Sequence, residues 1–109
     1  MSVFVQVIQF QLAGLSEADY RAHTERVAPA FSTMPGLLSK LWLANADTNT
    51  YGGVYTWRDR ASLEQYRASG IYGQLVSNPG LADVSDREFE ILPEPTRVTA
   101  PAVLAAAAA

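Results

Sequence analysis

The segment from Pro35 to Trp57 constrains the fold most, because it predicts two strands with large apolar or aromatic side chains on both faces. The strands cover Leu37–Ala44 and Gly53–Trp57, and a polar turn joins them. A strand with one solvated face alternates apolar with polar residues, and these two strands do not alternate in this way. The segment therefore predicts a sheet that is covered on both faces.

Two further strands are predicted near the ends of the chain. Val3–Leu12 is rich in β-branched and aromatic residues and is largely apolar on both faces. Ser85–Leu92 differs, because Arg87, Phe89 and Ile91 alternate with three acidic residues. This alternation predicts a half-solvated strand near an edge of the sheet.

The helical segments lie between these strands. Ser16 and Asp19 resemble a capping box at the start of a helix. One stripe of this helix carries Tyr20, His23, Val27, Ala30, Phe31 and Met34, and Pro29 should kink or locally open it. Asp59 predicts the N-cap of a second helix over Arg60–Ala68, and Ile71–Ser77 predicts a further short one.

The resulting order is strand, helix, strand, strand, helix, strand. This order predicts an α+β fold of the ferredoxin-like βαββαβ type, with a four-stranded antiparallel sheet and its helices on one face. The other face would then expose a second apolar row, larger than a monomer usually tolerates. We therefore expect a homodimer in which two sheets pack face to face into an α+β barrel.

The chain of 109 residues predicts one domain, over residues 1–95. Pro93, Pro95 and Pro101 indicate an extended exit from it. Residues 96–109 form a Pro/Ala-rich tail for which a frayed helix and a disordered segment both remain open.

Composition excludes several classes of function. There is no cysteine and only one histidine, so neither thiolate chemistry nor a zinc site is expected. A net charge of -3 with dispersed basic residues argues against a nucleic-acid partner. No apolar run reaches the ~20 residues of a membrane span, and the first residues lack the pattern of a signal peptide. We expect a cytoplasmic protein with no membrane partner.

Several short motifs together resemble a known family. They are Pro35-Gly36 before a strand, Lys40 and Trp42 within it, Gly52-Gly53-Val54-Tyr55, and Asp59 before the second helix. They resemble the YdhR-like putative monooxygenases of the dimeric α+β barrel superfamily, which are related to the antibiotic-biosynthesis monooxygenases. The resemblance covers Val3 to Pro95. It implies a ligand pocket between sheet and helices in each subunit, and oxidation of polycyclic aromatic compounds without metal or flavin.

His23 is the candidate catalytic residue, because imidazole exchanges protons near neutral pH. A partly exposed or hydrogen-bonded structural histidine is the alternative. The candidate substrate-binding residues offer flat apolar surfaces with polar groups, which suit a planar aromatic ligand. They are Tyr20, Trp42, Tyr55, Trp57, Tyr66, Tyr72 and the amide of Gln9. Ordinary core and dimer packing is the alternative for each aromatic residue.

The sequence leaves more than one role open for the single lysine and for two glutamines, and it also contains a pair of glycines. Lys40, the single lysine, could form a Schiff base or hold a carboxylate, or its stem could pack while its amine pairs with an acid of a partner subunit. Gln9 and Gln11 could orient a ligand or bond each other across a dimer. Gly52 and Gly53 lack the neighbours of a phosphate loop, so backbone clearance or a bulge is expected there.

These observations favour a cofactor-independent monooxygenase that acts on a small aromatic or polyketide-like substrate, with His23 as the base. A non-oxidative cyclase, isomerase or dehydratase on a similar substrate is one alternative, since the superfamily holds several activities. A non-catalytic small-molecule-binding protein is another.

Overall fold

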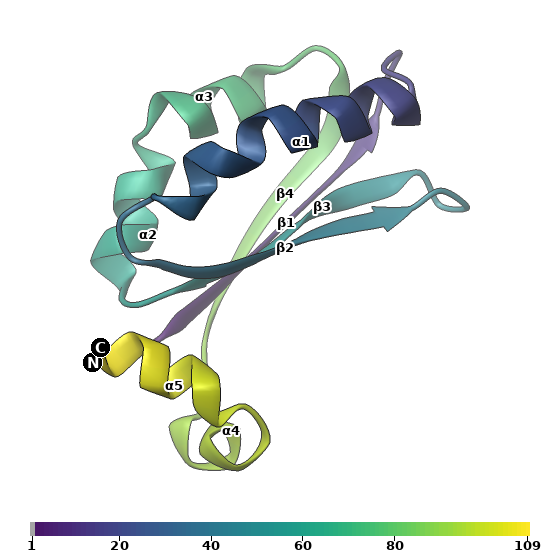
Figure 1. Ribbon diagram of the computed structural model, residues 1–109. Helices are drawn as coiled ribbons and strands as arrows, with labels where there is room; N and C mark the ends of the chain where they lie inside the picture. Colours follow the sequence, from purple (N-terminus) through teal and green to yellow (C-terminus); the bar gives the residue numbers. More distant parts are fainter. Residues whose placement is uncertain (1) are drawn as a thin grey trace.

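Strand β1 (Phe4–Leu12) lies inside a four-stranded antiparallel sheet whose order is β2-β3-β1-β4 (Figure 1). The computed structural model describes residues 2–109. The other strands are β2 (Leu37–Asn45), β3 (Thr50–Trp57) and β4 (Leu81–Glu90). This order confirms the predicted ferredoxin-like α+β fold, and β4 lies at an edge as its alternation indicated.

Helices α1 (Glu17–Ser32), α2 (Arg60–Arg67) and α3 (Gly70–Ser77) cover one face of the sheet (Figure 1). Side-chain caps begin all three helices, since Ser16 and Ser69 Oγ and Asp59 Oδ1 each accept a backbone N–H three residues on. Helix α1 runs without interruption through Pro29, so the expected local opening does not occur.

The pairing of β1 with β3 decides which side chains face the helices. Phe4 lies opposite Trp57, Gln6 opposite Tyr55, and Phe10 opposite Tyr51. These residues share one face of the sheet and are all buried. Together with Ile8, Tyr20, Phe31, Leu63 and Tyr66 they form the core between the sheet and the helices.

The opposite face carries the second apolar row that the sequence predicts. Val5, Val7 and Val54 occupy its centre, where they are neighbours across β1 and β3. Leu41 on β2 and Phe89 on β4 extend the row to both edges, and their exposed fractions are 64% and 53%. Helices α1, α2 and α3 leave this face uncovered, because they all lie on the other side of the sheet (Figure 1).

The two glycines of β3 provide backbone clearance, as predicted. Gly52 has a φ of 152°, and a Cβ atom there would collide with the carbonyl group of Ile8 on β1. A Cβ atom on Gly53 would lie 3.1 Å from Cε of Lys40. The pair therefore allows β1 to approach closely and leaves room for the lysine stem.

The C-terminal segment corrects one expectation. Instead of an extended exit, α4 (Pro93–Thr99) and α5 (Pro101–Ala108) follow β4, so the predicted domain boundary at residue 95 falls inside α4. Pro93 and Pro101 lie at the first helical position, where the missing N–H costs no hydrogen bond. Within residues 2–109, no helix has both the length and the apolar character needed to cross a membrane.

Candidate active site

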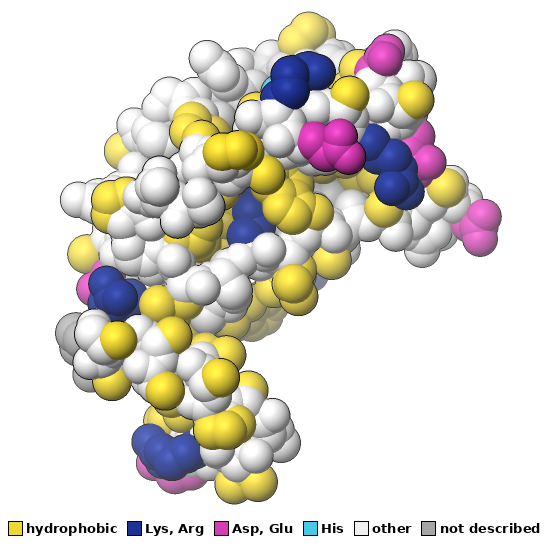
Figure 2. Space-filling model, in the orientation of Figure 1, with side chains coloured by type: hydrophobic (Ala, Val, Ile, Leu, Met, Phe, Trp, Pro, Cys, Tyr) yellow, Lys and Arg dark blue, Asp and Glu magenta, His cyan; other side chains and the backbone are white. Residues whose placement is uncertain are grey.

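A cavity of about 480 Å³ lies between the helix-covered face of the sheet and helices α1, α2 and α3. The sheet provides its floor, with Trp42 of β2 and Tyr55 of β3. Tyr20 and Phe31 of α1 and Tyr66 of α2 line it from the helix side. Figure 2 shows a hollow beneath α1 in which basic side-chain atoms are surrounded by hydrophobic ones.

The aromatic rings of the cavity contact one another closely. The Phe31 ring meets the Trp42 ring edge-on, with centroids 5.5 Å apart and an interplanar angle of 89°. The Phe31 and Tyr66 centroids are 5.9 Å apart, and those of Tyr55 and Tyr66 are 5.3 Å apart. These contacts lie within the favourable range for aromatic pairs, so each ring restrains its neighbours. The result is an apolar wall made of the faces and edges of aromatic rings.

The tyrosine hydroxyls supply polar groups to this wall. The Tyr55 and Tyr66 hydroxyl oxygens are 3.2 Å apart and form a hydrogen bond. Burial raises the pKa of both phenols, and it raises the pKa of Tyr20 to about 12. At neutral pH these phenols therefore carry their protons and act as hydrogen-bond donors, not as bases.

His23 lies on α1 at the rim of the cavity. Its neighbours on the predicted stripe, Tyr20 and Phe31, are buried, whereas the His23 side chain is exposed and still lines the cavity. It forms no hydrogen bond with another side chain within residues 2–109. Its ring is therefore accessible both to a ligand in the cavity and to solvent.

Lys40 extends from β2 across the cavity floor. Its Nζ lies 3.5 Å from the centroid of the Phe31 ring, 3.3 Å from that of Trp42 and 4.5 Å from that of Tyr55. Such contacts stabilise the ammonium form. Burial has the opposite effect and lowers the pKa of Lys40 to about 7. The ammonium form and the free amine are therefore both accessible to Lys40 near neutral pH.

Three predicted substrate-binding residues lie outside the cavity lining. Trp57 is fully buried beneath it, and Tyr72 points its hydroxyl to Asp86 on β4. Gln9 lies on the opposite face of the sheet, where it pairs with Gly52 and Ser85. Tyr20, His23, Trp42, Tyr55 and Tyr66 are the predicted residues that the structure brings together around the cavity.

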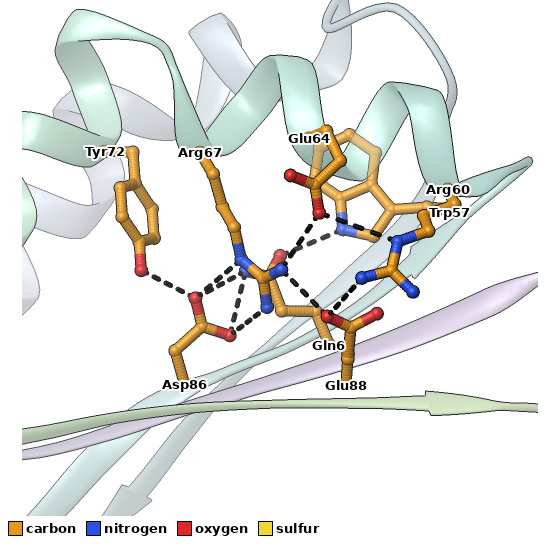
Figure 3. Close-up of polar contacts among 8 residues, drawn as sticks. All are labelled: Gln6, Trp57, Arg60, Glu64, Arg67, Tyr72, Asp86 and Glu88. Carbon is orange, nitrogen blue, oxygen red and sulfur yellow. Dashed lines mark hydrogen bonds and ion pairs between the residues drawn. The ribbon is translucent and has the colours of Figure 1, made fainter.

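A polar cluster that the sequence analysis missed lies beside the cavity, under α2 and α3 (Figure 3). The fully buried amide of Gln6 accepts a hydrogen bond from Trp57 Nε1 at 3.0 Å and donates to both Asp86 oxygens at 3.1 Å. Arg67 donates two hydrogen bonds to Asp86, at 3.0 and 3.1 Å, and Tyr72 donates one at 2.6 Å. Burial alone would raise the pKa of Asp86, but these hydrogen bonds outweigh it and lower the pKa.

The cluster fixes α2 relative to the sheet. Arg67 follows the wall residue Tyr66 directly, and its guanidinium also pairs with Glu88 at 2.9 Å. The acidic row of β4 therefore faces the helices, while Phe89 faces the open side. One sequence signal was available, because Gln6 is the one polar residue on an otherwise apolar strand face.

The sequence matches the protein family described as Putative mono-oxygenase ydhR over residues 5–102. No curated protein matches the sequence significantly. Within residues 2–109, no group of three or more His, Cys, Asp or Glu residues is placed to hold a metal ion.

Several solved structures share the fold. The NE2512 protein of unknown function from Nitrosomonas europaea has 17% identity and a TM-score of 0.71, over 84% of this chain and 91% of its own. SnoaB, a cofactor-independent oxygenase from Streptomyces nogalater, has 21% identity and a TM-score of 0.66, over 86% and 100%. The heme-degrader MhuD from Mycobacterium tuberculosis has 17% identity and a TM-score of 0.66, over 84% and 97%.

Replacing Asp86 tests whether the polar cluster stabilises the fold. We expect Asp86→Ala to lower the free energy of unfolding by about 2–4 kcal/mol, because it removes one of the carboxylates that pair with the partly buried Arg67 and leaves the buried amide nitrogen of Gln6 without its acceptor. Urea unfolding followed by tryptophan fluorescence measures this loss. Glu90→Ala, an exposed acidic residue of the same strand, should change stability by less than about 0.5 kcal/mol. Equal losses in the two variants would contradict the role of the cluster.

The pH dependence of stability tests the burial of Lys40. Its pKa of about 7 in the folded protein lies below the value of about 10.4 expected in the unfolded chain. Between these values the unfolded chain binds more protons, so the wild type gains stability as the pH rises. Lys40→Met removes this group, so we expect the variant to be the more stable protein near pH 7 and its advantage to shrink towards about pH 10. Urea titrations across this range measure the difference.

Arg21, an exposed arginine of α1 outside the cavity lining, offers a matched control for that measurement. Arg21→Met removes a cation that stays protonated throughout the range. Its stability difference from the wild type should therefore stay constant with pH. A constant difference for Lys40→Met as well would show that the amine is not desolvated.

Proposed function

Because the chain belongs to the ydhR family of putative mono-oxygenases, we propose that its cavity binds a small planar aromatic or polyketide-like compound and oxygenates it without a cofactor. The supporting observation is the wall of contacting rings from Phe31, Trp42, Tyr55 and Tyr66. Aromatic apolar walls of this kind bind planar ligands and exclude water from the reacting atoms.

The substrate itself would supply the electrons. His23 takes a proton from an acidic C–H group flanked by aromatic or carbonyl carbons, and the carbanion reduces molecular oxygen. A hydroperoxide forms at this carbon and then loses water, using the second proton of the CH₂ group. Overall, one CH₂ group and one O₂ give one C=O group and one H₂O, so atoms and electrons balance.

A homodimer is part of this proposal. The apolar row of Val5, Val7, Val54, Leu41 and Phe89 faces away from the helices. A second copy of the same face would cover it by sheet-on-sheet packing, which places each row against itself across a two-fold axis. The proposed dimer leaves the cavity, on the other face of each sheet, within one subunit.

Oxygen consumption with an anthrone tests the proposed reaction, because its CH₂ group lies between two aromatic rings. We expect one O₂ consumed for each carbonyl formed, with one atom of ¹⁸O₂ in the product. His23→Ala should lower the rate by about 10²-fold or more, since it removes the base. Glu25→Ala, an exposed neighbour outside the cavity, should leave the rate unchanged.

Three outcomes would contradict this reaction. Equal oxygen uptake with the wild type and with His23→Ala would show that His23 is not the base. Turnover under anaerobic conditions would favour the cyclase or isomerase alternative. Thermal stabilisation by a ligand that is recovered unchanged would favour a binding protein.

Light scattering after size exclusion tests the dimer. We expect twice the monomer mass for the wild type and the monomer mass for Leu41→Glu, because the charge would be buried against the second sheet. Val76→Glu on the outer side of α3 changes a residue of similar exposure, 46% against 64%, and should remain dimeric. A monomeric wild type would contradict the proposed assembly.

A further inference from the structure

One charged group on the cavity floor takes no part in the reaction described above. The amine of Lys40 lines the cavity, and no carboxylate of residues 2–109 lies within 4.0 Å of it. Asp86 and Glu88 of β4, at the opposite edge of the sheet, pair with Arg60 and Arg67 instead. Holding a cation in apolar surroundings without an anion lowers the stability of the folded protein. We therefore expect an anionic partner for Lys40 from outside the chain.

The sheet is built to hold this amine at the cavity. Gly53, on the neighbouring strand, has no side chain, and a Cβ atom there would crowd Cε of Lys40. Two rings, Phe31 and Trp42, lie within 3.5 Å of Nζ and restrict its movement. The amine is therefore placed at a defined point, unlike a flexible surface lysine.

The other ionisable groups around the cavity leave this point positive. Asp19, His23 and Arg26 come from α1 and are exposed at the rim, and the part of α3 that lines the cavity has no ionisable group. Tyr20 of α1, Tyr55 of β3 and Tyr66 of α2 are phenols whose raised pKa values keep them neutral. An anion on the floor would meet one ammonium group and nearby hydroxyl donors.

We propose that Lys40 binds the ligand as its oxygen anion, so that the compound taken up by this cavity is a planar phenol or enol. The ion pair forms in either of two equivalent ways: an anion binds the ammonium form, or a neutral ligand gives its proton to the free amine. This inference rests on the proposed function of the cavity and adds the charge and the acidic group of its ligand. The ammonium group of Lys40 would also stabilise the ligand anion that forms on deprotonation.

The ionisation of bound 4-nitrophenol tests the proposal directly, because its phenolate is yellow and its neutral form is not. An apolar cavity alone would raise the pKa of the bound phenol, whereas an ammonium group beside its oxygen lowers it. We expect binding to the wild type to increase the yellow fraction at slightly acidic pH. Binding to Lys40→Met should decrease it, so the two proteins give spectral changes of opposite sign.

Affinities from calorimetry complete the test. Lys40→Met should weaken the binding of the phenolate by about tenfold or more and should leave neutral 4-nitroanisole within about twofold. Arg21→Met removes an exposed cation outside the cavity and should retain the wild-type colour change. Because Lys40→Met replaces a desolvated amine with an apolar chain of similar length, we expect it to fold, and circular dichroism checks this.

Each other result has a definite meaning. If 4-nitroanisole and 4-nitrophenol bind the wild type but the bound phenol stays neutral, Lys40 does not bind an anion, while the cavity remains a small-molecule site. If Lys40→Met shows the same colour change as the wild type, another group holds the charge and the proposal is wrong. If neither compound binds, both the function proposed for the cavity and the role of Lys40 fail.

Discussion

The buried amide of Gln6 is the link on which the rest of this structure depends. Its oxygen accepts from the indole of Trp57 in the centre of the core, and its nitrogen donates to Asp86 at the edge of the sheet. Asp86 in turn holds Arg67 of α2 and Tyr72 of α3. An amide suits this position because it can donate and accept at once, so both polar atoms of the buried Gln6 side chain have partners. Helix α2 thereby acquires a fixed position, and with it the Tyr66 ring beside the cavity.

The cavity combines two properties that usually oppose each other. Its wall of contacting rings is dry and apolar, whereas its floor carries the amine of Lys40. Aromatic faces reconcile the two, because their negative quadrupole attracts a cation without offering it a counter-charge. The charge of the site is therefore retained inside an environment that magnifies its effect on any ligand.

The pattern of apolar residues along the strands was sufficient to predict most of the fold, but it predicted only part of the candidate site. The apolar rows on both faces of Val3–Leu12 and Leu37–Ala44 predicted the sheet and its open side, because side-chain direction alternates strictly along a strand. Alternation could not assign a row to a face, so Gln9 was grouped with residues that line the cavity. Trp57 lies on the cavity face, but alternation could not show that it is fully buried in the core. The cluster around Asp86 joins residues as much as 80 positions apart, and no local pattern encodes such a contact. Helix α4 was missed because its prolines were interpreted as signs of an extended chain, whereas proline is also favoured at the first helical position, where Pro93 lies.

The two sides of the cavity are held by different kinds of force. Directed hydrogen bonds and ion pairs fasten α2 and α3 to β4, and these bonds lose strength steeply when their angles change. Helix α1 touches the sheet through ring contacts of Tyr20 and Phe31, with one polar contact from Glu17 to Tyr51 near its first turn. Contacts between rings depend on shape and close packing, and they have no donor and acceptor to align. The α2 side of the cavity is consequently positioned by the directions of its hydrogen bonds, and the α1 side mainly by the packing of its rings.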